Sequence, residues 1–239
     1  MPYNWSEFDE SLKKWNIELT ANQKEQLFIY YEMLIEKNKV MNLTTVTEFD
    51  EVLIKHFLDS ISLCQILDLN NEYNVLDMGT GAGFPGIPLK ICFPNLKVTL
   101  ADSLNKRVLF LQEVIEKLDL KGINAIHARA EELAKDKEYR EKFDFCVSRA
   151  VANLATLSEY SLPFVKESGK FISYKSGEID AEAIEAKHAI FLLGGKLEQV
   201  YKFDLPNTDM KRSFVVVEKV KKTPKAYPRK AGLASKSHL

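Results

Sequence analysis

The stretch Asp77-Met78-Gly79-Thr80-Gly81-Ala82-Gly83 decides the fold of this chain. It ends the short apolar run of residues 74–78, which predicts a β-strand, and it precedes Pro85 and Pro88, which suit the start of a helix. Three glycines at alternate positions permit positive φ angles and a close approach of the backbone to a ligand. The stretch therefore predicts a strand–turn–helix unit whose turn binds a small molecule.

Short apolar runs alternate with helical periodicity over residues 71–221, a pattern typical of βαβ units. The clearest helix runs from Leu104 to Leu118, and a further helix is expected near residues 181–193. The predicted strands are residues 74–78, 97–101, 125–128, 143–148, 169–174, 196–203 and 213–220. They predict an α/β fold with a seven-stranded, mostly parallel sheet, whose last two strands form an antiparallel hairpin at the sheet edge.

The parts outside this core have different patterns. Residues 1–70 predict a helical N-terminal extension, because Thr20-Ala21-Asn22-Gln23 fits a capping box and apolar residues from Phe49 to Cys64 recur at helical spacing. Residues 222–239 contain Pro224 and Pro228 and are expected to be irregular. The chain is therefore expected to have three parts, at 1–70, 71–221 and 222–239.

Composition excludes several classes of protein. With 46% hydrophobic and 28% charged residues among 239, the chain is typical of a globular protein. It has no apolar run of about 18 residues and no basic, apolar leader, so we expect a cytoplasmic protein with no membrane span. Its three cysteines are widely spaced among apolar neighbours, which favours reduced core residues over a metal site or a disulfide.

Charge is distributed unevenly along the chain. The segment from Lys219 to Leu239 has seven Lys or Arg residues and no acidic residue, whereas the whole chain has a net charge of -1. Such asymmetry suggests either a basic arm for a polyanion or a solvated, frayed terminus.

Two classes of cofactor fit the glycine turn. Gly81-x-Gly83-x-x-Gly86 matches the dinucleotide fingerprint, in which a helix N-terminus binds a pyrophosphate. Asp77 stands two residues before the first glycine, where a carboxylate would repel a pyrophosphate and suit a cofactor carrying an ammonium and a sulfonium. The Asp-x-Gly-x-Gly-x-Gly arrangement resembles motif I of S-adenosylmethionine-dependent methyltransferases. Asp102, at the end of the second strand, suits the ribose of either class, and a purely structural turn is the third alternative.

Five blocks narrow this resemblance. They are Asn42-Leu43-Thr44, His56-Phe57-Leu58-Asp59-Ser60, the loop from Asp77 to Pro88, Asp102-Ser103-Leu104-Asn105-Lys106-Arg107 and Ser148-Arg149-Ala150. Together they resemble the RsmG family, also called GidB, of bacterial 16S ribosomal RNA methyltransferases, and the resemblance spans nearly the whole chain. It implies a class I (Rossmann-like) methyltransferase fold, S-adenosyl-L-methionine as cofactor, and methylation of N7 of one guanine near the decoding region. Naked rRNA, the small ribosomal subunit and an assembly intermediate are all possible substrates.

The turn and the resemblance together indicate the site residues. The expected cofactor-binding residues are Asp77, Gly79, Gly81, Gly83, Phe84, Asp102, Ser103, Leu104, Ala130, Glu131 and Arg149. The candidate RNA contacts are Lys106, Arg107, Lys175, Arg229 and Lys230. Arg149 follows the fourth strand, at the end where ligands bind in such sheets, so it is also a candidate for orienting the substrate. We expect no metal, and a monomer.

The implied reaction needs no general base, because a guanine ring nitrogen attacks with an available lone pair and loses no proton. Methylation of a pyrimidine carbon would need a cysteine nucleophile, but Cys146 lies inside an apolar strand. His56 is three residues from Asp59, a spacing more typical of a structural hydrogen bond than of a catalytic base. The alternative functions are a methyltransferase that acts on another RNA, a small molecule or a protein, and a non-enzymatic RNA-binding module.

Overall fold

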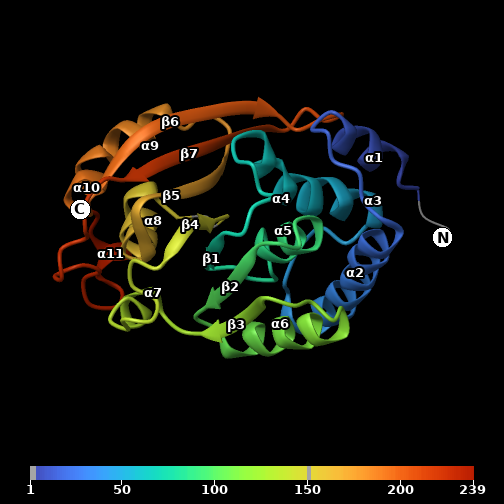
Figure 1. Cartoon of the computed structure of the whole chain (residues 1–239), viewed down its shortest axis with the longest axis horizontal. Helices are drawn as coiled ribbons and strands as arrows, with labels where there is room; N and C mark the ends of the chain where they lie inside the picture. The colour runs from blue at the N-terminus through green and yellow to red at the C-terminus, as the bar shows by residue number, and fades with distance from the viewer. Residues whose placement is uncertain (1–3, 150–151) are drawn as a thin grey trace.

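A computed structural model describes residues 4–149 and 152–239. One seven-stranded sheet forms its centre, with strand order β3-β2-β1-β4-β5-β7-β6 (Figure 1). The strands are β1 (Asn74–Met78), β2 (Lys97–Asp102), β3 (Ile123–His127), β4 (Phe143–Ser148), β5 (Val165–Ser176), β6 (Gly195–Asp204) and β7 (Lys211–Lys219). All seven predicted strands are confirmed, although β3 begins two residues earlier than expected and β5 is longer at both ends.

The sheet is parallel from β3 to β5, and β7 runs antiparallel to both β5 and β6. The predicted terminal hairpin is therefore confirmed, but only β6 lies at the edge, because β7 is inserted between β5 and β6. Because β1, β2, β4 and β5 are parallel, their carboxyl ends lie at the same end of the sheet. This is the end that carries the glycine turn.

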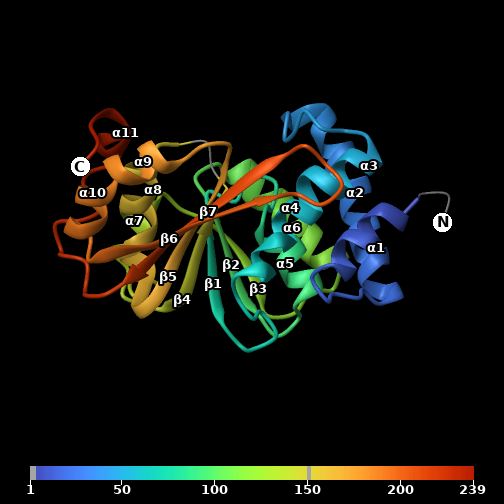
Figure 2. The same ribbon diagram turned by 90° about the horizontal axis from the view of Figure 1, so that it is seen from above.

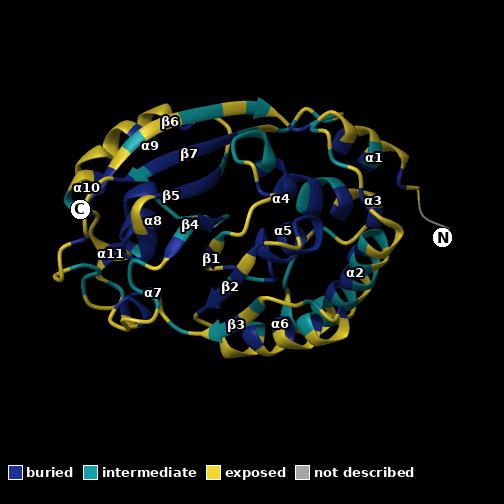
Figure 3. Ribbon diagram, in the orientation of Figure 1, coloured by how far each residue is buried: buried dark blue, intermediate teal, exposed yellow. Residues whose placement is uncertain are grey.

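Successive residues of the central strands point to opposite faces, and each face is covered by its own apolar cluster. Val75 of β1 belongs to the first cluster and Leu76 to the second. Figure 2 shows helices on both sides of the sheet, and Figure 3 shows that β7 is largely buried. The helices after β1 are α5 (Gly86–Cys92), α6 (Asn105–Lys117), α7 (Ala130–Leu133), α8 (Leu154–Ser161), the 3₁₀-helix η3 (Leu162–Phe164), α9 (Asp180–Glu185), α10 (Lys187–Leu192) and α11 (Leu233–Lys236).

Helix α6 confirms the prediction from Leu104, which is the extended residue just before the helix. The single helix expected near residues 181–193 is instead two helices, α9 and α10. The chain turns between them at Ala186, whose side chain is buried in the second cluster.

The N-terminal segment is helical, as predicted. Its helices are α1 (Ser6–Lys13), α2 (Ala21–Met41), α3 (Phe49–Val52), the π-helix η1 (Leu53–Leu58), α4 (Asp59–Ile61) and the 3₁₀-helix η2 (Ser62–Gln65). Thr20 and Gln23 form the predicted capping box at the start of α2. The periodicity indicated a helix from Phe49 to Cys64 but not its π-helical turn, which contains His56.

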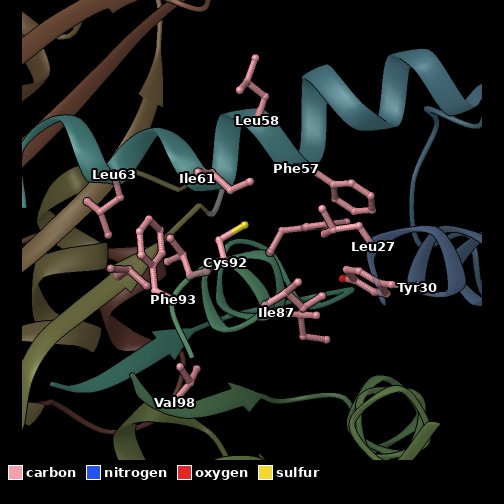
Figure 4. Packing of buried hydrophobic residues seen from close by; sticks show 14 of the residues in the cluster. Leu27, Tyr30, Phe57, Leu58, Ile61, Leu63, Ile87, Cys92, Phe93 and Val98 are labelled. Atoms are coloured by element: carbon pink, nitrogen blue, oxygen red, sulfur yellow. The ribbon is translucent and has the colours of Figure 1, made fainter. Parts of the chain in front are cut away.

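These helices share the first cluster with α5 and α6. Figure 4 shows Tyr30 from α2, Phe57 from η1 and Ile87 from α5 pointing toward one another. The Tyr30 and Phe57 rings are stacked with centroids 5.5 Å apart. The N-terminal segment therefore packs directly against the helix that follows the glycine turn. The boundary between this segment and the following domain at residue 70 stays a prediction.

Three further findings concern the rest of the chain. Cys64, Cys92 and Cys146 are free thiols, as predicted, and the last two are buried. Among the described residues, no helix is both long and apolar enough to cross a bilayer, and no three metal-ligating side chains gather into a cluster. Ala150, the last residue of the predicted Ser-Arg-Ala block, lies outside the described residues.

Candidate active site

A cavity of about 410 Å³ opens at the carboxyl ends of β1, β2 and β4. Five of the predicted cofactor residues line it: Gly79, Asp102, Ser103, Ala130 and Glu131. Its other lining residues, which the sequence did not single out for this role, include Met78, Arg107, Ser148, Tyr160, Gly232 and Ser235. This volume lies within the range of small-molecule sites, so the cavity is the candidate cofactor site.

Asp77 lies beneath the glycine turn with none of its surface exposed. Its Oδ2 accepts hydrogen bonds from Thr80 Oγ1 at 2.6 Å and from the Gly86 N–H at 2.8 Å. Burial raises its pKa to about 6, although these hydrogen bonds and Arg149 act in the opposite direction. The carboxylate was expected to face a cationic cofactor. It instead points into the loop and holds the loop's shape, while Oδ1 has no partner among the described residues.

Gly83 is required by close packing within the loop. Its φ is +109°, and a Cβ there would lie 2.6 Å from Ile87 Cδ1 and 2.7 Å from the Tyr30 hydroxyl. That hydroxyl donates to the Ala82 carbonyl at 2.6 Å, which fixes the loop to helix α2. Gly79 and Gly81 also have positive φ but leave open space where a side chain would stand. These two glycines therefore have open space beside the backbone, whereas Gly83 serves the packing.

Asp102 joins the end of β2 to the glycine turn and is only 4% exposed. Its Oδ2 accepts from the Gly81 N–H at 2.9 Å, and its Oδ1 accepts from the Leu104 N–H at 2.9 Å. Arg107, a predicted RNA contact, forms an ion pair with the same carboxylate at 3.4 Å. Leu104 is 42% exposed and is not part of the cavity wall. Its predicted cofactor contact stays a prediction.

Arg149, Phe84 and His56 form a stack beside the glycine turn. The Arg149 guanidinium lies 4.8 Å from the centre of the Phe84 ring, and the His56 ring is stacked on Phe84 with centroids 4.7 Å apart. All three line a second cavity of about 160 Å³, together with Thr44 and Gly79 among others. Gly79 thus lines both cavities, so the second one adjoins the candidate cofactor site.

His56 is held as a neutral ring. Burial, followed by the charge of Arg149, lowers its pKa from 6.5 to about 4. Its Nε2 is 2.7 Å from Thr44 Oγ1, and its Nδ1 is 3.4 Å from Arg149 Nη2. The predicted structural role is therefore supported, but these contacts take the place of the expected hydrogen bond to Asp59.

Asp59 accepts hydrogen bonds from two arginines. Arg149 Nη1 donates to Oδ2 at 3.0 Å, and Arg212 Nε donates to Oδ1 at 2.8 Å. All three residues line a third cavity, of about 500 Å³. Lys175 lines it as well, and its Nζ donates to Glu182 at 2.8 Å and to the Ala152 carbonyl at 2.7 Å. Arg149 thus lines both the second and the third cavities.

The remaining predicted RNA contacts differ in their surroundings. Lys106 and Lys230 are exposed, whereas Arg229 is paired with the buried Glu159. Burial raises the pKa of the Cys146 thiol well above its usual value. Cys146 is therefore a poor nucleophile, which agrees with the core role predicted for it.

Known proteins resemble this chain over most of its length. The family described as rRNA small subunit methyltransferase G (GidB) matches residues 23–213. A relative from Lachnoclostridium phytofermentans named Ribosomal RNA small subunit methyltransferase G is 54% identical over 98% of this chain and 97% of its own length. One of the same name from Desulforamulus reducens is 53% identical over 96% of each chain.

Solved structures share the fold at lower identity. M. jannaschii TYW2 in complex with AdoMet has a TM-score of 0.51 and 20% identity, over 63% of this chain and 71% of its own. TrmN from Thermus thermophilus has a TM-score of 0.52 and 19% identity, over 70% of this chain and 53% of its own. The expected Rossmann-like methyltransferase fold is thus confirmed, and the chain belongs to the GidB family of small-subunit rRNA methyltransferases.

Proposed function

We propose that this protein transfers a methyl group from S-adenosyl-L-methionine to N7 of one guanine of 16S rRNA. The observation that carries the proposal is the position of Gly79, which lines both the candidate cofactor cavity and the second cavity, the one formed by Arg149, Phe84 and His56. A cofactor in the first cavity and a base approaching Arg149 would therefore meet at the glycine turn.

The residues present fit this cofactor. Asp102 presents a buried carboxylate where ribose hydroxyls would lie. Gly79 and Gly81 present backbone with room for the methionine part, and Ala130 and Glu131 line the candidate cofactor cavity and would contact adenine. Asp77, Gly83 and Phe84 would act indirectly by shaping the loop. The bound cofactor supplies an electrophilic methyl group on a sulfonium.

Arg149 is the residue best placed to orient the base. Its guanidinium is held by Asp59 and by the Phe84 ring, so a free N–H could donate to guanine O6, next to the reacting nitrogen. No acid or base has to move a proton, because N7 carries none. The described residues around the turn agree with this, since His56 is neutral and already bonded to Thr44. Positioning can then supply much of the rate acceleration.

The substrate would be bound through cationic side chains that contact phosphates without reading sequence. Lys106 and Lys230 are exposed and suited to this role. Arg107 and Lys175 are paired with carboxylates and would have to exchange them for phosphates. We also propose that the protein acts as a monomer in the cytoplasm, where this rRNA is made.

Transfer of a labelled methyl group tests the proposal. Purified protein with labelled cofactor should label unmodified 16S rRNA, either naked or in the small subunit, and nuclease digestion should release the label as 7-methylguanosine. Comparison of naked rRNA, subunits and assembly intermediates would identify the preferred form. Label in another RNA, or in a small molecule alone, would contradict the proposal.

A further inference from the structure

The segment after β7 forms part of the wall of the candidate cofactor cavity. Gly232 and Ser235 line this cavity beside Tyr160 and Glu131. The Gly232 N–H donates to Glu131 Oε1 at 3.1 Å, so the segment touches a predicted cofactor residue directly. Charge asymmetry suggested a basic arm or a frayed end, but this segment is folded onto the body of the protein.

A buried ion pair holds this segment in place. Glu159 of α8 is 1% exposed, and its Oε2 lies 2.7 Å from Arg229 Nη2. Its Oε1 also accepts from Arg229 Nε at 3.0 Å and from the Arg229 backbone N–H at 2.7 Å. One carboxylate thus binds both the side chain and the backbone of Arg229, three residues before Gly232. Fork-like pairing of this kind fixes geometry as well as contributing energy.

Further contacts continue on both sides of Arg229. Arg140 donates to the carbonyls of Thr223 and Tyr227 at 2.9 and 3.0 Å. On the other side, Thr156 of α8 donates to the Ala234 carbonyl at 2.9 Å, and Ala234 is 2% exposed. The segment is therefore attached before Gly232 and again between Gly232 and Ser235, the two residues that face the cavity.

We infer that the Glu159–Arg229 pair is a clasp that holds residues 229–236 as a wall of the cofactor site, at its Glu131 end. The two residues act as positioning residues for cofactor binding, and Arg229 is not a free phosphate contact. This inference rests on the proposed function, because it takes the cavity to be the cofactor site. It follows that breaking the clasp weakens cofactor binding, whereas removing an exposed lysine of the same segment affects RNA binding instead.

Two variants test the clasp by different routes. Glu159→Gln keeps the shape of the side chain but removes its charge, and Ser235→Trp fills the cavity from its wall while leaving the clasp intact. Lys236→Ala, at the exposed position after Ser235, is the matched control. Calorimetry with S-adenosylmethionine on the full chain should show dissociation constants raised roughly tenfold or more for the first two variants, and within about twofold for the control.

A kinetic split separates positioning from general destabilisation. In Glu159→Gln we expect the KM for cofactor to rise while the KM for rRNA stays within about twofold, and Lys230→Ala should show the reverse pattern. Thermal unfolding of the cofactor-free Ser235→Trp protein should match that of the wild type. Wild-type cofactor affinity in Glu159→Gln would overturn the clasp, and wild-type affinity in Ser235→Trp would show that the segment is not a wall of the cofactor site. A wild-type protein that binds no cofactor would overturn the proposed function itself.

Discussion

The Arg149 guanidinium lies 4.8 Å from the centre of the Phe84 ring and so joins the end of β4 to the glycine turn. The same guanidinium donates to Asp59, which belongs to the N-terminal helices. Three segments far apart in the sequence thus converge on one side chain. A cation over an aromatic face gains more when it is partly shielded from water, as Arg149 is.

Arg149→Lys tests whether this arrangement serves the reaction. Lysine keeps the charge but cannot both stack on Phe84 and bind Asp59 with a planar fork. We expect methyl transfer to 16S rRNA to slow by roughly tenfold or more under single-turnover conditions with saturating cofactor. Cofactor affinity measured by calorimetry should change by less than about threefold. An unchanged transfer rate would show that Arg149 does not orient the substrate.

Asp102→Asn probes the link between β2 and the glycine turn. Asparagine loses the charge, and its amide cannot accept from both the Gly81 and Leu104 N–H groups as the carboxylate does. Because a lost charged hydrogen bond costs about 1.5–3 kcal/mol, cofactor affinity should fall roughly 10- to 100-fold. Asp119→Asn, which alters an exposed carboxylate paired with Lys121, is the control and should leave affinity unchanged. Equal affinities in the two variants would argue against a cofactor role for Asp102.

Gly83→Ala and Gly79→Ala separate packing from backbone strain. Both positions have positive φ, a backbone conformation that alanine disfavours, so the free energy of unfolding should fall by about 1–2 kcal/mol in both variants. Only at Gly83 would the new methyl group also collide with Ile87 and the Tyr30 hydroxyl, which adds about 1–3 kcal/mol. Urea unfolding should therefore find Gly83→Ala the less stable variant. Equal stabilities would mean that the loop is not held against α2 as described.

His56 predicts a dependence of stability on pH. Its pKa is lowered to about 4 by burial and then by Arg149, so the folded protein binds the proton less tightly than the unfolded chain. The stability that it contributes is complete above pH 6.5 and is lost as pH falls toward 4. Between pH 7.5 and 5, the wild type should lose roughly 1–2 kcal/mol more than His56→Gln.

Asp77 has the opposite dependence, because its raised pKa of about 6 removes stability as pH rises from 3.8 through 6. Both the wild type and His56→Gln contain Asp77, so the difference between their free energies of unfolding in urea reports the contribution of His56 alone. If the two proteins lost stability equally on acidification, His56 would not be held neutral in the folded state.

Local patterns predicted the sheet and the backbone conformation of the glycine turn well. Short, mostly apolar runs mark β1 and β4, so both strands were bounded correctly, and the three glycines of the turn have the positive φ angles that were expected. Charge counting could not reveal that Arg229 binds Glu159, because that partner is distant in sequence and only folding brings the two together. The Tyr30–Ala82 hydrogen bond and the π-helical turn at His56 depend likewise on long-range packing.

The position of the C-terminal segment also changes how a truncation would be interpreted. Deletion of the residues after Lys221 would remove Gly232 and Ser235 from the cavity wall as well as the exposed lysines. A loss of activity in such a variant would therefore not by itself show that the segment binds RNA. Point variants at Glu159 and Lys230 separate the two effects.

The most direct measurement is mass spectrometry of 16S rRNA from cells that lack this protein, before and after incubation with the purified protein and S-adenosylmethionine. We predict that one 7-methylguanosine is missing from this rRNA and returns after incubation, at a position that the fragment masses identify. A 16S rRNA that is fully methylated without the protein, or that gains no methyl group from it, would contradict the proposed function.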